Sequence, residues 1–114
     1  MNKLSFTICL LIFVFSTVYA QQGGFTGPSI GAVTVAEALT FRDDTPVILR
    51  GKIERFIGNE RYIFSDGTGS ITIEIDNRVW GSLTVDENDL IEIYGEIERD
   101  FRRIEIDVDT VRKL

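Results

Sequence analysis

The sequence lacks histidine altogether, and its single cysteine, Cys9, lies in an apolar stretch near the N-terminus. Without histidine, no side chain has an ordinary pKa near neutral pH, where the usual general base of an enzyme works. Beyond residue 20 the chain has no thiol, which excludes disulfides and a cysteine nucleophile there. These absences argue against catalysis, and we expect a non-enzymatic protein with no catalytic residue, no cofactor and no metal site.

Basic residues are fewer than acidic ones: the chain has 12 Lys and Arg and 18 Asp and Glu, which gives a net charge of −6. The phosphate backbone of a nucleic acid repels such a chain, so we expect no nucleic-acid partner. The same charge attracts cations, which include metal ions, polyamines and basic peptides. The composition therefore points to cationic partners.

The N-terminus has the layout of a secretory signal peptide. Lys3 gives a basic start, residues 4–18 form an uncharged apolar run, and Val18-Tyr19-Ala20 provides an exit of small or modest residues. The alternative is a retained membrane anchor, but a run of about fifteen residues is shorter than the roughly twenty that a spanning helix needs. We therefore predict cleavage after Ala20, a periplasmic protein that is not integral to a membrane, and a mature net charge of −7 because Lys3 is removed.

Residues 21–33 hold four glycines and one proline, which is typical of a flexible arm. After the arm, Thr34 followed by Glu37 fits a capping box and predicts a short helix from about Val35 to Thr40. The predicted organisation is thus a signal peptide at 1–20, an arm at 21–33 and one domain at 34–114.

Apolar and polar residues then alternate in four segments, at 47–54, 71–76, 91–98 and 104–109, and Tyr62-Ile63-Phe64 predicts a further short strand after the first of them. A period of two indicates β-strands with one buried face, and closing five short strands into a barrel removes most exposed edges. Gly51 and Gly95 lie within the two longest segments, where we expect bends or bulges. Trp80 lies in the one long connection, and we predict that it plugs an open end of the barrel rather than serving as a stacking platform.

Five short segments occur in a characteristic order: GFTGP at 24–28, TVAEA at 34–38, DGTG at 66–69, VW at 79–80 and IEIDVD at 104–109. With these segments the chain resembles the bacterial OB-fold (BOF) family, also called the YgiW/YdeI stress-tolerance family. The resemblance implies a mainly β, five-stranded OB-fold (Greek-key) barrel with a short N-terminal helix. It also implies a periplasmic, non-enzymatic protein linked to tolerance of cationic peptides, peroxide or metals.

Acidic residues supply the first candidate binding site. Glu105, Asp107 and Asp109 share one face of the last strand, and Glu92, Glu96 and Glu98 would join them if the last two strands pair. One interpretation is a surface that binds cationic peptides or ions. The other is a solvated face whose outward acids are partly neutralised across strands, by Arg50, Lys52, Arg102 and Arg103.

Aromatic residues supply the second candidate site. Tyr62, Phe64, Tyr94 and Phe101 are the rings that we place on the usual ligand face of an OB-fold. Phe101 lies between the last two strands, either as a turn residue folded back on the barrel or as a contact for a partner.

These features predict a periplasmic binding protein that acts in envelope stress tolerance. The expected partner is a cationic peptide, a small ligand, an envelope component or an outer-membrane protein. The alternative is an OB module that binds an oligonucleotide or an oligosaccharide.

Overall fold

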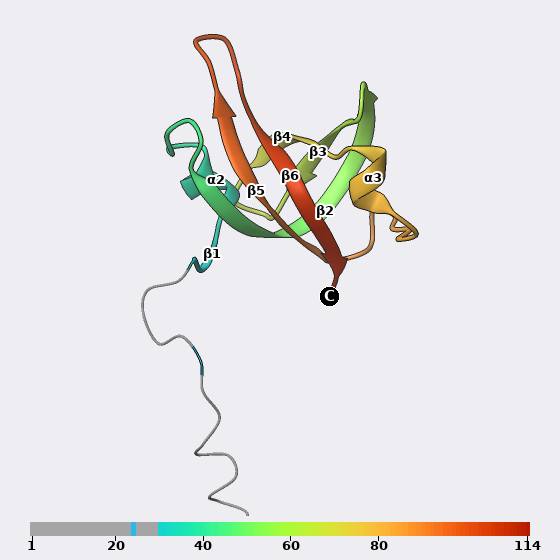
Figure 1. Cartoon of the computed structure of the whole chain (residues 1–114). Helices are drawn as coiled ribbons and strands as arrows, with labels where there is room; N and C mark the ends of the chain where they lie inside the picture. Colours follow the sequence, from blue (N-terminus) through green and yellow to red (C-terminus); the bar gives the residue numbers. More distant parts are fainter. Residues whose placement is uncertain (1–23, 25–29) are drawn as a thin grey trace, which may run out of the picture.

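The computed structural model describes residue 24 and residues 30–114 (Figure 1). The elements in chain order are β1 (Ala32–Val33), α2 (Val35–Ala38), β2 (Pro46–Gly58), β3 (Arg61–Ser65), β4 (Ser70–Glu74), α3 (Asn77–Trp80), β5 (Ile91–Arg99) and β6 (Ile104–Lys113). The predicted signal peptide and most of the predicted arm lie outside the described residues. In the part that the structure describes, no helix has the length and hydropathy of a membrane span.

The five longer strands close into a barrel in the order β2-β3-β4-β6-β5, and β5 pairs again with β2. The β4–β6 pair is parallel, whereas the other pairs around the barrel are antiparallel. This arrangement confirms the predicted five-stranded, mainly β fold, and it is the Greek-key barrel of the OB-fold. Strand β1 pairs in parallel with β2, so the paired chain begins two residues before the predicted domain boundary at residue 34.

Glycines let the long strands pass close to their neighbours. At Gly51, β2 changes partner from β5 to β3, and an added Cβ would lie 2.3 Å from the backbone oxygen of Ser65. At Gly95 the β5–β6 register shifts, and an added Cβ would lie 2.1 Å from the backbone oxygen of Asp107. Both contacts are far too close for any side chain. The predicted irregularity is confirmed at Gly95, whereas at Gly51 the structure shows a close approach of the β3 backbone without a register shift.

The inward-facing residues of the alternating segments form one apolar core. Its buried members are Val35, Ala38, Val47, Leu49, Ile53, Phe64, Ile71, Ile73, Ile75, Ile91, Ile93, Ile97, Ile106 and Val108. Burial of each large apolar side chain contributes about 1.5–3 kcal/mol, so this core is the main source of stability. Beyond the core, residues 54–57 are exposed but still belong to β2. The strand is therefore longer than the segment 47–54 that the apolar alternation predicted.

The capping box at the start of α2 is confirmed. The Thr34 hydroxyl accepts a hydrogen bond from the Glu37 amide at 3.1 Å, and the Glu37 carboxylate accepts one from the Thr34 amide at 2.9 Å. The helix ends at Ala38, earlier than the predicted Thr40. The short helix α3 was not predicted; it begins after Asp76, whose side chain accepts a hydrogen bond from the Arg78 amide at 2.8 Å.

The β3–β4 turn is tied to the N-terminus of α2. The Asp66 carboxylate accepts a hydrogen bond from the Val35 amide at 2.9 Å, and the Thr68 hydroxyl accepts one from the Ala36 amide at 3.1 Å. Burial acts to raise the pKa of Asp66, but hydrogen bonds from Thr68 and Val35 outweigh it and lower that pKa. The turn therefore holds the helix against one end of the barrel.

Candidate functional site

Three adjacent strands, β4, β6 and β5, bring acidic side chains together on the outer surface of the barrel. The register aligns Glu105 with Glu98 in one row, and Glu74 with Asp107 and Glu96 in the next. Asp109 follows on β6 beside the bulge at Gly95. We call this surface the acidic face, and it consists of Glu74, Glu96, Glu98, Glu105, Asp107 and Asp109.

Three carboxyl groups of the acidic face, those of Glu96, Glu98 and Asp107, have raised pKa values. A hydrogen bond with Asp109, partial burial and the negative charges of Asp109, Asp107 and Asp44 raise the pKa of Glu96 to about 7. Burial and the charges of Asp109 and Glu105 raise the pKa of Asp107. The face therefore holds more negative charge than its surroundings neutralise, and a bound proton or cation relieves that repulsion.

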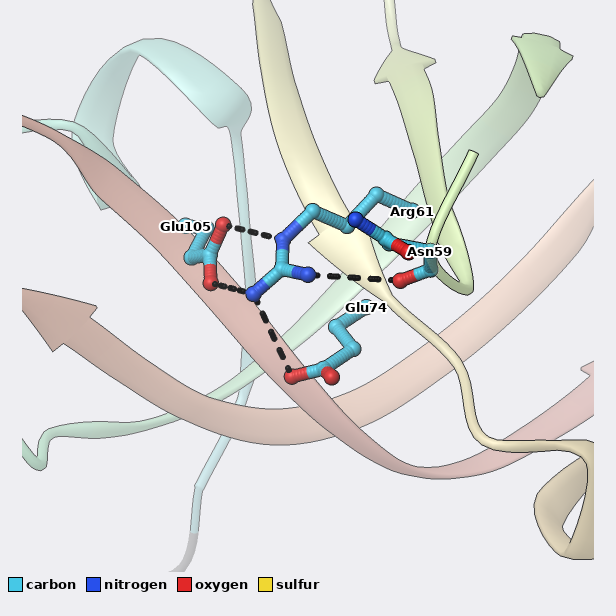
Figure 2. Close-up of polar contacts among 4 residues, drawn as sticks. All are labelled: Asn59, Arg61, Glu74 and Glu105. Carbon is cyan, nitrogen blue, oxygen red and sulfur yellow. Dashed lines mark hydrogen bonds and ion pairs between the residues drawn. The ribbon is translucent and has the colours of Figure 1, made fainter. Parts of the chain in front are cut away.

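One arginine enters the acidic face from β3 (Figure 2). Arg61 Nε and Nη2 donate to the two carboxylate oxygens of Glu105, each at 3.0 Å, and Nη1 donates to the backbone oxygen of Asn59 at 3.2 Å. Nη2 also lies 4.0 Å from a carboxylate oxygen of Glu74. Because Glu105 is only 3% exposed, this fork-shaped contact compensates a buried charge.

The burial of Glu105 contradicts the expectation that all these acids are solvated. The strand alternation correctly places it on the outer side, but the arginine, whose contribution was not predicted, covers it. Carboxylate oxygens of Glu74, Glu98 and Glu105 lie within 4.8 Å of one another, which is the spacing of a group that could hold a metal ion. Arg61 already contacts Glu74 and Glu105, so a cation entering there competes with its guanidinium.

A cavity of about 270 Å³ adjoins this face, near the β5–β6 hairpin. It is lined by Asp43, Asp44, Glu98, Arg99, Asp100, Arg103 and Glu105. Arg99 is engaged by the protein itself, because its Nε donates to the backbone oxygen of Phe41 at 2.9 Å. The cavity thus extends the acidic surface toward the loop before β2.

Glu92 lies apart from the acidic face, although the sequence placed it there. The register sets it between Arg50 of β2 and Arg112 of β6, whose Nε atoms donate to its carboxylate at 2.8 and 2.9 Å. Hydrogen bonds from Arg50 and Arg112 lower the pKa of Glu92. Cross-strand neutralisation is therefore confirmed for Arg50, whereas the other three predicted bases form no ion pair within the described residues.

The aromatic candidates do not assemble into one ligand face. Placing Phe64 there was wrong, because it is fully buried in the core. Tyr62 also points inward, and its hydroxyl accepts a hydrogen bond from Trp80 Nε1 at 3.2 Å. Tyr94 is half-buried on the outer side, between β2 and β6. Phe101 is 93% exposed at the hairpin tip, which rules out folding back on the barrel.

The closed order of the five strands, with its single parallel pair, is that of an OB-fold protein. Solved structures agree, since the Stn1–Ten1 complex of Schizosaccharomyces pombe shares the fold with a TM-score of 0.61, at 17% identity over 79% of this chain and 81% of that chain. The family described as bacterial OB fold (BOF) protein matches residues 14–113, and the chain belongs to it.

Two relatives show how similar the chain is to other members. Protein YgiW of Escherichia coli K12 is 42% identical over 100% of this chain and 98% of its own. The solved structure of the hypothetical protein ygiW from E. coli has a TM-score of 0.74 and 45% identity, over 82% of this chain and 100% of that chain. The calcium-regulated OB-fold protein CarO of Pseudomonas aeruginosa is 39% identical over 86% of this chain and 85% of its own.

Proposed function

We propose that this protein is an exported, non-enzymatic binding protein that acts in envelope stress tolerance, and that its acidic face binds cationic ligands such as basic peptides. One observation carries the proposal: six carboxylates share this face, and Arg61 is the one basic side chain that pairs with it within the described residues. The raised pKa of Glu96 supports it, because the binding of a positive charge relieves the repulsion between the carboxylates and lowers the free energy of the face.

Export and the lack of catalysis rest on other features. The basic start and apolar run before Ala20 support export. The absence of histidine, and of cysteine after residue 20, supports a role in binding rather than catalysis. Of the relatives named above, CarO is described as calcium-regulated and ygiW as hypothetical, and neither description denotes a reaction.

An oligonucleotide suits this surface poorly. The phosphate backbone carries the same sign of charge as the acidic face, and an OB-fold that binds single strands relies on a basic groove. The oligosaccharide alternative carries no such repulsion, so an uncharged oligosaccharide serves as the comparison ligand in the test.

The test is a calorimetric titration of the purified protein with an oligo-lysine peptide at pH 6 and pH 8. We expect binding to be stronger at pH 8, where Glu96 is ionised, and to weaken as salt rises, because added ions screen exposed charges. Glu96→Gln should weaken binding at pH 8 by up to about fivefold, which corresponds to the roughly 1 kcal/mol of an exposed charge pair. At pH 6 the substitution should have little effect.

Glu92→Gln is the matched control, because it makes the same charge change on the same strand, at a carboxylate already bound by two arginines. It should leave oligo-lysine binding nearly unchanged. Binding that ignores salt, a Glu92→Gln effect as large as that of Glu96→Gln, or preference for the uncharged oligosaccharide would each contradict the proposal.

A further inference from the structure

A second surface, separate from the acidic face, carries three aromatic rings in contact. Phe56 of β2 and Tyr62 of β3 have ring centroids 5.2 Å apart, and those of Tyr62 and Trp80 are 5.7 Å apart. The hydrogen bond from Trp80 Nε1 to the Tyr62 hydroxyl holds the latter pair in an edge-to-face arrangement at 76°. These rings border a cavity of about 190 Å³ between the β2–β3 hairpin and α3.

The pocket is open to a ligand on the side of Phe56. This large apolar side chain is 61% exposed, whereas Tyr62 and Trp80 are half-buried against the core. Cavities that hold drug-sized molecules measure about 300–1,000 Å³, so a space of about 190 Å³ suits a single side chain of a larger partner.

The rim of this cavity is acidic. Glu54, Asp86 and Glu87 line it together with one basic residue, Arg55. Arg55 lies 3.6 Å from a Glu54 carboxylate oxygen, so these two charges offset each other. Asp86 and Glu87 then leave the rim negative, and the negative faces of the aromatic rings attract positive charge as well.

We infer that this aromatic pocket binds an arginine side chain of a cationic peptide. A guanidinium is planar, always charged and weakly hydrated, so it stacks on aromatic rings while its edge donates to carboxylates. A lysine ammonium is a compact, strongly hydrated charge and gains less from the rings. The pocket thus prefers arginine to lysine, whereas the acidic face responds to charge of either kind.

Trp80 is the only tryptophan of the chain, so its fluorescence reports on this pocket directly. The probes are an acetylated, amidated Gly-Arg-Gly-Arg-Gly peptide and the same peptide with lysine or uncharged citrulline in place of arginine. We expect the arginine peptide to change the Trp80 emission with saturation, the lysine peptide to bind more weakly, and the citrulline peptide to have no effect.

Two substitutions probe the pocket and two serve as controls. Phe56→Leu keeps an apolar side chain but removes the ring, and Glu87→Gln removes a rim charge. Each should lower the affinity for the arginine peptide by about two- to fivefold, as expected for the loss of one exposed cation–π or charge contact. Phe101→Leu removes an exposed ring elsewhere, and Glu92→Gln removes a carboxylate that two arginines already neutralise. Neither should change the affinity read from Trp80.

The inference is overturned if calorimetry shows peptide binding while the Trp80 emission stays constant. It is also overturned if citrulline binds as well as arginine, if an uncharged oligosaccharide quenches Trp80 and the peptide does not, or if Phe101→Leu has the same effect as Phe56→Leu. Because the readout is local to Trp80, these results leave the test of the acidic face independent.

Discussion

Replacing Arg61 with methionine would leave the Glu105 carboxylate buried without its cation. In the folded barrel Arg61 donates two hydrogen bonds of 3.0 Å to Glu105, which is 3% exposed. Removing one partner of a buried ion pair costs about 3–5 kcal/mol, because the remaining charge loses its compensation. We therefore expect Arg61→Met to lower the free energy of unfolding by about 3–4 kcal/mol at pH 7.

Proton binding limits this loss and makes it depend on pH. Burial without a cation favours the neutral form of a carboxyl group, and that form becomes easier to populate as the pH falls. The deficit of Arg61→Met relative to the parent protein should shrink accordingly on acidification.

Urea denaturation followed by circular dichroism at pH 7 and pH 5 measures both quantities. The double variant Arg61→Met/Glu105→Leu removes both charges and should stay within about 2 kcal/mol of the parent protein. Arg50→Met is the matched control: Arg50 is 57% exposed where it binds Glu92, and its loss should cost about 1 kcal/mol or less. A loss below about 1 kcal/mol for Arg61→Met at pH 7, or a double variant as unstable as the single one, would refute the reasoning.

The remaining predictions concern pH dependence, the turn beside α2 and the bulge in β5. The pKa of Glu96, about 7, lies above the ordinary 4.5, so its stabilising contribution is complete below about pH 4.5 and is lost as the pH rises through 7. Melting curves at pH 5 and 8 should therefore show that the parent protein loses stability over this range and that Glu96→Gln loses less. Asp66→Asn weakens the acceptor of the Val35 amide and should cost about 1–2 kcal/mol in urea denaturation; an unchanged midpoint would contradict this. Gly95→Ala places a Cβ 2.1 Å from the Asp107 backbone oxygen and should cost about 3 kcal/mol or more, whereas a stable variant would show that the bulge adapts.

The strands and their closure could be predicted because a period of two directly reports one buried face. The same signal failed where every residue is apolar: Tyr62, Ile63 and Phe64 give no alternation, so the sequence could not show that Phe64 points into the core. It also failed beyond the core, because β2 continues through Phe56 although this apolar side chain is exposed. Local alternation therefore predicts strands where burial is one-sided and loses their ends elsewhere.

The acidic face was predicted in outline, since Glu96, Glu105 and Asp107 do lie on one side of paired strands. Its internal chemistry depends on contacts between distant positions. Arg61 reaches Glu105 across 44 positions of the chain, and no local pattern encodes that contact. Glu92 resembles Glu96 in its strand position, and the two differ only in the neighbours that the register supplies. Predicting which acids remain unpaired thus requires the register, not the composition.

The measurement that tests the central claim most directly is NMR mapping of an oligo-lysine titration with the isotope-labelled protein at pH 8. We predict that the largest chemical-shift changes fall on β4, β5 and β6 around Glu74, Glu96 and Asp107, that they diminish at high salt, and that Glu92 and its arginine partners stay unchanged. Shift changes centred on any other surface, or none at low salt, would contradict the assignment of the acidic face as a binding site for cations.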